Sequence, residues 1–118
     1  MLGIGLGECI AKEGSLKLKE LTYKHCQAYS LSNASNGYVN YAKSHEGTPT
    51  FFVLLNDQYK EKSLKYLEFI TQKIKAKVFL LSDIEDAEER KQLEAKVTLV
   101  FWVPHSGYLS ALLCIIPI

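Results

Sequence analysis

The sequence predicts an α/β fold, a three-layer sandwich in which a mainly parallel sheet lies between helices. Two apolar runs, Thr50–Leu55 and Lys77–Leu81, have the continuous hydrophobicity of strands that are buried on both faces. Helical patterns alternate with the strands, which favours parallel strands joined by helices. The 118 residues suit one domain, and their 47% hydrophobic and 23% charged content is that of an average soluble globular protein.

The first segment, Met1–Gly7, is expected to be the end of a strand that enters a glycine-rich turn. Its glycines alternate as G-x-G-x-G, which differs from the dinucleotide-binding pattern G-x-G-x-x-G, and hardly any strand precedes them. We therefore expect a tight strand-to-helix turn rather than a nucleotide site. A helix over Glu8–Tyr23 and a short strand over His25–Ser30 are predicted to follow.

A polar loop, Leu31–Gly37, precedes a predicted helix over Tyr38–Ser44. Ser32, Asn33 and Ser35 in this loop are residue types that favour helix N-caps. A turn after a strand of an α/β sheet is also a place where free backbone N–H groups bind anions. Capping and anion binding explain the composition about equally well, so the sequence leaves both open.

The second half of the chain continues the alternation. A helix over Gln58–Lys75 carries an apolar stripe, and the charged segment Glu85–Lys96 is predicted to be a helical or irregular part of the surface. Val97–Val103 is a further strand, and a turn leads from it into an apolar helix over Tyr108–Ile118. That helix is much shorter than the ~20 residues that span a membrane, so no membrane partner is expected.

Charge and residue spacing exclude several classes of function. The net charge is +1 and the lysines are spread along the chain, so no nucleic-acid partner is expected. The three cysteines are too few and too scattered for a disulfide framework, which favours a reducing, cytoplasmic setting with buried thiols. The three histidines have no metal-ligand spacing to cysteines or carboxylates, so neither a metal nor a cofactor is expected.

One helical face carries candidate chemistry. Glu13, Lys17, Glu20 and Lys24 are three or four residues apart, so they are predicted to share a face. A carboxylate and an ammonium group held side by side serve proton transfer in some sites. An ordinary solvated row of salt bridges has the same spacing and is the more common case.

Further candidate positions follow from the predicted sheet. In open parallel sheets, ligands bind beyond the carboxyl ends of the strands, near the point where the strand order reverses. The loops that follow the predicted strands are Gly3–Gly7, Ser30–Gly37, Asn56–Gln58, Ser82–Ile84 and Pro104–Gly107. This selection rests on the fold alone and names no chemistry.

The segment Glu13–Tyr23 closely resembles the motif E-G-A-L-K-L-K-E-[IV]-S-Y of a sugar isomerase (SIS) domain. This is the second SIS domain of glucosamine-6-phosphate synthase, also called glutamine–fructose-6-phosphate aminotransferase. The resemblance extends over nearly the whole chain, to Leu2–Gly5, His25–Tyr29, Pro49–Leu55, Pro104–His105 and Ile116–Pro117. It implies a single, partly truncated SIS domain over residues 1–118, with a Rossmann-like or flavodoxin-like sheet.

The resemblance also implies roles for single residues. Glu20 stands where the family has the glutamate that moves a proton between C1 and C2 of the sugar, and Lys17 stands where a lysine assists electrostatically. The family's ring-opening histidine reaches from the next loop into the neighbouring subunit's site. Asn36 stands at that position here, and an amide does not shuttle protons near neutral pH. The loop expected to bind substrate contributes Ser30, Ser32, Ser35 and Asn36.

The resemblance leaves two functions open. One is an SIS-type domain that binds a phosphosugar, such as fructose-6-phosphate or glucosamine-6-phosphate, without catalysis of its own. The alternative is an aldose–ketose isomerase with Glu20 as base. The family's C-terminal tail, first SIS domain and glutaminase domain have no counterpart in this sequence, and the final helix is apolar. We therefore expect a homodimer or a missing partner segment.

Overall fold

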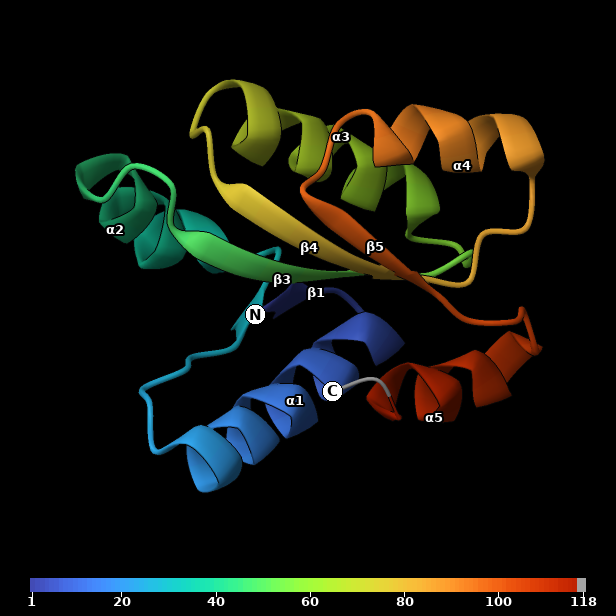
Figure 1. Cartoon of the computed structure of the whole chain (residues 1–118), viewed down its shortest axis with the longest axis horizontal. Coiled ribbons are helices and arrows are strands. Elements are labelled where there is room, and N and C mark those ends of the chain that lie inside the picture. The colour runs from blue at the N-terminus through green and yellow to red at the C-terminus, as the bar shows by residue number, and fades with distance from the viewer. Residues whose placement is uncertain (117–118) are drawn as a thin grey trace.

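Five parallel strands form the sheet at the centre of the computed structural model, which describes residues 1–116 (Figure 1). The strands lie in the order β2-β1-β3-β4-β5. Their bounds are β1 Leu2–Gly3, β2 Tyr29–Ser30, β3 Pro49–Leu54, β4 Lys77–Ser82 and β5 Leu99–Trp102. All neighbouring pairs are parallel, so the carboxyl ends of the strands meet at one edge of the sheet.

Helices cover both faces of the sheet, which confirms the predicted three-layer sandwich. One face carries α1 (Leu6–Thr22) and α5 (Ser110–Ile115), and the other carries α2 (Tyr38–Ser44), α3 (Lys60–Gln72) and α4 (Ala87–Glu94) (Figure 1). Two 3-10 turns, η1 (Ala34–Asn36) and η2 (Gly107–Leu109), precede α2 and α5. Within residues 1–116, no helix has the length and apolar character that crossing a membrane requires.

The core has two halves, because alternate residues of each central strand face opposite layers. In β3, Phe52 packs toward the layer of α2, α3 and α4, whereas Val53 packs toward α1 and α5. Ile70 of α3 belongs to the first half, and Ile10 of α1 and Cys114 of α5 belong to the second. Burial on both faces explains the continuous apolar runs of the central strands.

Several element bounds differ from the prediction: the helix predicted over Gln58–Lys75 is Lys60–Gln72, and the strand predicted over Val97–Val103 is Leu99–Trp102. The strand predicted over His25–Ser30 is reduced to Tyr29–Ser30, because β1 offers only two residues for pairing. Helix α1 begins at Leu6, two residues before the predicted Glu8. The last predicted helix begins as a 3-10 turn at Gly107 and continues as α5. Pro117, on which part of the resemblance rests, and Ile118, the predicted end of the last helix, lie outside the described residues.

Two local predictions are wrong. Side chains of the loop 31–37 do not cap the following helices: η1 begins after Asn33 and α2 after Gly37, and neither has a side-chain hydrogen bond at its cap. The thiols are not all buried either. Cys114 is buried, but Cys26 is half-buried and Cys9 is exposed.

The strand order reverses between β1 and β3. Helix α1 leads outward from β1 to β2, and α2 leads back to β3 on the other side of β1. In open parallel sheets, such a reversal marks where ligands bind at the carboxyl edge. The structure therefore places all five predicted loops, including Ser30–Gly37 after β2, along one edge of the molecule.

Candidate functional site

The predicted carboxylate–ammonium pair is formed on α1. Lys17 Nζ lies 3.0 Å from Glu20 Oε2 and 3.6 Å from Glu13 Oε1. The hydrogen bond with Glu20 raises the pKa of Lys17, and the negative charges of Glu20 and Glu13 raise it further. Lys24 was predicted on the same face but lies beyond the helix, whose C-cap is Tyr23 in the left-handed conformation.

Glu20 points away from the sheet, and Lys17 lies on the flank of α1. The buried residues of α1 are Gly7, Ile10, Ala11, Gly14 and Ser15. A turn of about 100° per residue places Glu20 on the outer side of the helix and Lys17 between the two sides. Their side chains are 44% and 53% exposed. The pair is open to solvent, so it forms only one side of a ligand site.

The predicted binding loop lies at the other end of α1. Ser30 ends β2, and Ser32 donates its backbone N–H to Ser30 Oγ over 3.4 Å. Glu8, in the first turn of α1, lies near this loop: the side chains of Lys12 and then Ser30 lower the pKa of its carboxylate. The remaining predicted binding residues, Ser35 and Asn36, are exposed on η1.

The two groups of predicted residues do not meet within one chain. Glu8 lies near the binding loop, and Glu20 belongs to the carboxylate–ammonium pair. Both glutamates are on α1. Their separation in the sequence corresponds to about 18 Å along the helix axis. The structure thus joins Lys17 to Glu20 and Ser30 to Ser32, but it keeps these two clusters at opposite ends of α1.

A cavity of about 440 Å³ opens at the amino edge of the sheet. The residues that line it include Leu18 and Thr22 of α1, residues 24–27 and the start of β3. Lys24 is among them, but none of the residues predicted for catalysis or substrate binding is. Tyr38 and Thr50 contribute polar groups, with their hydroxyl oxygens 2.8 Å apart, and burial raises the pKa of Tyr38. Because Leu18 and Thr22 face inward, Glu20 points away from this cavity.

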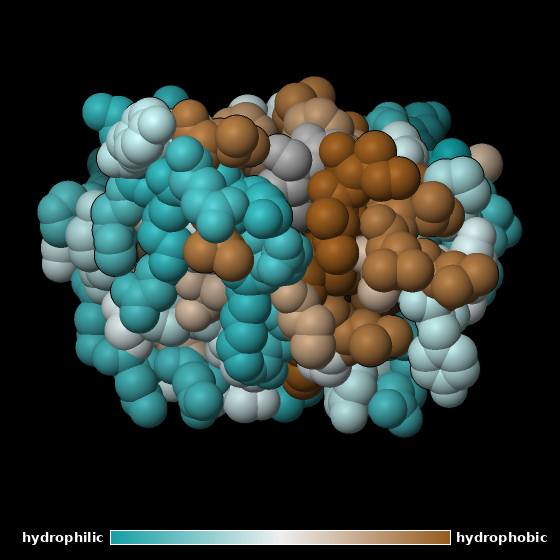
Figure 2. All heavy atoms as spheres, turned by 90° about the horizontal axis from the view of Figure 1, so that it is seen from below, coloured by the Kyte–Doolittle hydropathy of each residue, from teal (hydrophilic) through white to brown (hydrophobic). Residues whose placement is uncertain are grey.

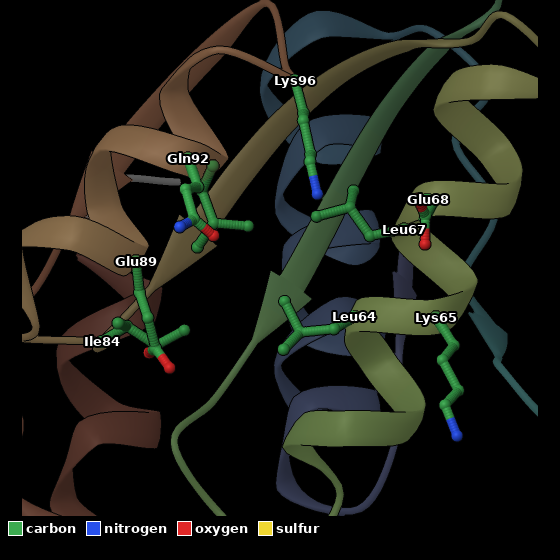
Figure 3. Close-up of a pocket in the computed structure, with 9 residues that line it drawn as sticks. Leu64, Lys65, Leu67, Glu68, Ile84, Glu89, Gln92 and Lys96 are labelled. Atoms are coloured by element: carbon green, nitrogen blue, oxygen red, sulfur yellow. The ribbon is translucent and has the colours of Figure 1, made fainter.

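Figure 3 shows a smaller cavity, of about 190 Å³, between α3 and α4. Leu64, Leu67 and Ile84 give it an apolar floor. The polar side chains around it are Lys65, Glu68, Glu89, Gln92 and Lys96. Lys60 Nζ lies 2.6 Å from Glu89 Oε2, which ties α3 to α4. Both signs of charge surround this cavity, so its charges do not select an anionic ligand.

Three of the predicted loops converge at the carboxyl edge of the sheet on the carboxylate of Asp83, which follows β4 and is 1% exposed. Asp83 Oδ1 lies 2.7 Å from the backbone nitrogen of Asn56 after β3, and Asp83 Oδ2 lies 2.7 Å from Nδ1 of His105 after β5. Burial and the charge of Asp83 raise the pKa of Cys114 to about 12, so this thiol keeps its proton.

Sequence reasoning selected these loops but not the Asp83–His105 contact. The histidines were judged only by their spacing along the chain, whereas Asp83 and His105 are 22 residues apart and meet because β4 and β5 are neighbours. Within the described residues, no group of three or more histidine, cysteine, aspartate or glutamate side chains is placed to hold a metal ion.

Comparison with known proteins gives one consistent result. No family model matches the chain. It is similar to proteins named glutamine–fructose-6-phosphate aminotransferase [isomerizing]. The protein from Clostridium tetani is 30% identical over 118 residues. The protein from Methanosarcina acetivorans is 33% identical over 110 residues, and that from Pyrobaculum aerophilum is 32% identical over 118 residues. These alignments cover 99%, 93% and 99% of this chain but only 18%, 17% and 18% of the relatives. The chain is thus similar to one part of a much longer enzyme.

Proposed function

We propose that this chain is an SIS-type domain that binds a phosphosugar, such as fructose-6-phosphate or glucosamine-6-phosphate, and is not catalytic by itself. The similarity to an aminotransferase over 99% of the chain supports this function. The observation that carries it is the 3.0 Å contact between Lys17 and Glu20, inside the segment that resembles the family's catalytic motif. A cytoplasmic setting belongs to the same proposal, because all three cysteines are free.

A partner is part of the proposed function, because the Lys17–Glu20 pair on α1 is open to solvent. Beside α1, helix α5 and its flanks expose Leu109, Leu112 and Ile116. Figure 2 shows hydrophobic side chains gathered next to hydrophilic ones on this face of the molecule. An apolar patch with polar neighbours is typical of an interaction site. We infer that a second copy of the chain covers this patch and supplies the missing wall of the sugar site.

The distance between the two predicted clusters supports such a shared site. About 18 Å of helix separates the Lys17–Glu20 pair from the loop of Ser30 and Ser32 in one chain. In the family that the sequence resembles, the loop after this strand contributes to the neighbouring subunit's site. A symmetric dimer gives each site the pair from one chain and the loop from the other.

The first experiment measures ligand-induced thermal stabilisation. A ligand that binds only the native state stabilises it by RT ln(1 + [L]/Kd), so millimolar ligands give a measurable shift. Fructose-6-phosphate, glucosamine-6-phosphate, glucose-6-phosphate and inorganic phosphate are compared. We expect a selective shift with a sugar phosphate that is lost in Glu20→Gln and kept in Glu68→Gln, a matched change at an exposed glutamate of α3. The absence of any shift with all four compounds contradicts phosphosugar binding.

The Lys17–Glu20 contact also favours a second candidate, an aldose–ketose isomerase with Glu20 as base. Isomerisation needs one group that removes a proton from one sugar carbon and returns it to the next, and a carboxylate held beside an ammonium group has this capacity. Interconversion of the phosphosugars by the wild-type chain and its loss in Glu20→Gln support this candidate. An inert wild-type chain at high concentration refutes it and leaves the binding function standing.

A further inference from the structure

The carboxylate of Asp83 determines which nitrogen of His105 carries a proton. Its Oδ1 accepts the backbone N–H of Asn56, and an ionised carboxylate has no proton to donate. Its Oδ2 therefore accepts a hydrogen bond from Nδ1 of His105 over 2.7 Å. A neutral imidazole has a single N–H, so Nε2 of His105 carries a lone pair and no proton.

This Nε2 atom is available to a ligand. The His105 side chain is 34% exposed, whereas that of Asp83 is 2% exposed, so a buried acceptor holds an accessible ring. No hydrogen bond to Nε2 of His105 occurs within residues 1–116. Gly107, two residues further on, is also open, because a Cβ atom there would meet nothing within 4 Å. The ring follows β5 and so lies at the carboxyl edge of the sheet.

We propose that Asp83 and His105 form a ligand site at the carboxyl edge of the sheet, in which Nε2 of His105 accepts a hydrogen bond from a hydroxyl group of the ligand. The Asp83 carboxylate fixes the tautomer that leaves the lone pair of Nε2 free, and no covalent bond breaks on binding. The ligand class is a hydroxylated small molecule, such as a polyol or a sugar, because the lone pair of Nε2 requires a hydrogen-bond donor.

This site is separate from the proposed phosphosugar site. It uses neither Lys17 nor Glu20, which lie in the second half of α1, whereas the chain enters α1 at the carboxyl edge. The loop of Ser30 and Ser32 is at the carboxyl edge too, but it follows β2, at the opposite end of the strand order from β5. A purely structural role for Asp83 and His105, as a tie between the loops after β3, β4 and β5, is the competing explanation. A structural role requires only the two hydrogen bonds to Asp83. It does not require that Nε2 of His105 react with a reagent or be protected by a ligand.

The first test identifies the tautomer by nitrogen-15 NMR of the histidine rings. In the wild-type chain we expect the proton of neutral His105 on Nδ1. In Asp83→Asn, the amide oxygen keeps the hydrogen bond from Asn56 and the amide N–H₂ then faces Nδ1, which moves the proton to Nε2. A wild-type ring with its proton on Nε2 overturns the proposal. His25→Gln and His45→Gln assign the other two rings, and a thermal melt checks that each variant folds.

The second test probes Nε2 with diethyl pyrocarbonate, which acylates an unprotonated imidazole nitrogen and releases ethanol and carbon dioxide. His25 and His45 serve as internal references. We expect His105 to react faster than both and to slow several-fold in Asp83→Asn, because that variant protonates Nε2. Equal rates at His105 in the two proteins overturn the proposal.

The third test identifies the ligand class by measuring which compounds protect His105 from diethyl pyrocarbonate. Sorbitol and fructose-6-phosphate are expected to slow the reaction of His105 relative to His25 and His45, and inorganic phosphate is expected to have no effect. Protection by phosphate alone refutes the hydroxyl ligand, and no protection by any of the three refutes a ligand site. Because sugar binding at Glu20 is read out by Glu20→Gln, failure of one site does not imply failure of the other.

Discussion

Gly3 and Gly7 pack backbone against backbone, so closely that a Cβ atom on Gly3 would lie 2.1 Å from the carbonyl oxygen of Gly7. The contact holds the end of β1 against the first turn of α1. The backbone N–H of Gly7 also donates to the carbonyl of Ile4 over 3.0 Å. The alternating glycines of the sequence therefore serve close packing between a strand and a helix, as the predicted tight turn requires.

We predict that Gly3→Ala lowers the free energy of unfolding by about 3 kcal/mol, because main-chain atoms rather than a flexible side chain have to move. Gly107→Ala is the matched control. Gly107 has φ +57° but open space around it, so the backbone conformation alone costs about 1 kcal/mol. Urea denaturation of both variants measures the difference. Equal losses would show that the contact with Gly7 relaxes without cost.

Removal of the Tyr66 hydroxyl group is predicted to stabilise the protein. This hydroxyl is buried and has no hydrogen-bond partner within the described residues. Because an unpaired buried polar group loses its hydration without compensation, Tyr66→Phe raises the free energy of unfolding by about 1 kcal/mol. Tyr38→Phe is the opposite case, since it removes a 2.8 Å hydrogen bond to Thr50 and costs about 1 kcal/mol. A loss of stability in Tyr66→Phe at neutral pH contradicts the unpaired state.

How far the sequence predicts the fold is clear from β3 and β2. The apolar run Thr50–Leu55 is buried on both faces, so its composition alone identifies a central strand. The segment His25–Ser30 was also predicted as a short strand, but a strand needs a neighbour, and β1 pairs only with Tyr29 and Ser30. Pairing is a tertiary property, so strand length at the amino edge does not follow from local pattern.

The same distinction separates the two candidate sites. Lys17 and Glu20 are three residues apart on one helix, so their contact follows from helical geometry and was predictable. Asp83 and His105 meet only because β4 and β5 are neighbours in the sheet. The sequence predicts that both follow strands, but it does not contain the strand order. Whether a helical pair faces a cavity or solvent also depends on which side of α1 packs on the sheet.

Stability is predicted to fall at alkaline pH. Burial raises the pKa of Cys114 from 9.0 to about 12 and that of Tyr66 from 10.0 to about 12. Between these values the native state keeps protons that the unfolded chain releases, so the free energy of unfolding is highest below pH 9 and decreases as pH rises toward 12. Urea midpoints measured across this range test the slope. As pH rises, Tyr66→Phe should lose less stability than the wild type. If the free energy of unfolding has the same slope against pH in both proteins, Tyr66 does not contribute.

Leu112→Lys is predicted to weaken self-association without unfolding the chain. Leu112 is 63% exposed on α5, so its replacement removes no core packing, and a charge at the centre of the apolar patch opposes contact with a second copy. Tyr41→Lys is the matched control, because Tyr41 is 56% exposed on α2, which covers the other face of the sheet. Sedimentation over a range of protein concentrations should show a dimer for the wild type and for Tyr41→Lys, and a monomer for Leu112→Lys. A wild-type chain that stays monomeric at the highest concentration refutes the homodimer, and the wall opposite Lys17 and Glu20 then has to come from a different polypeptide segment.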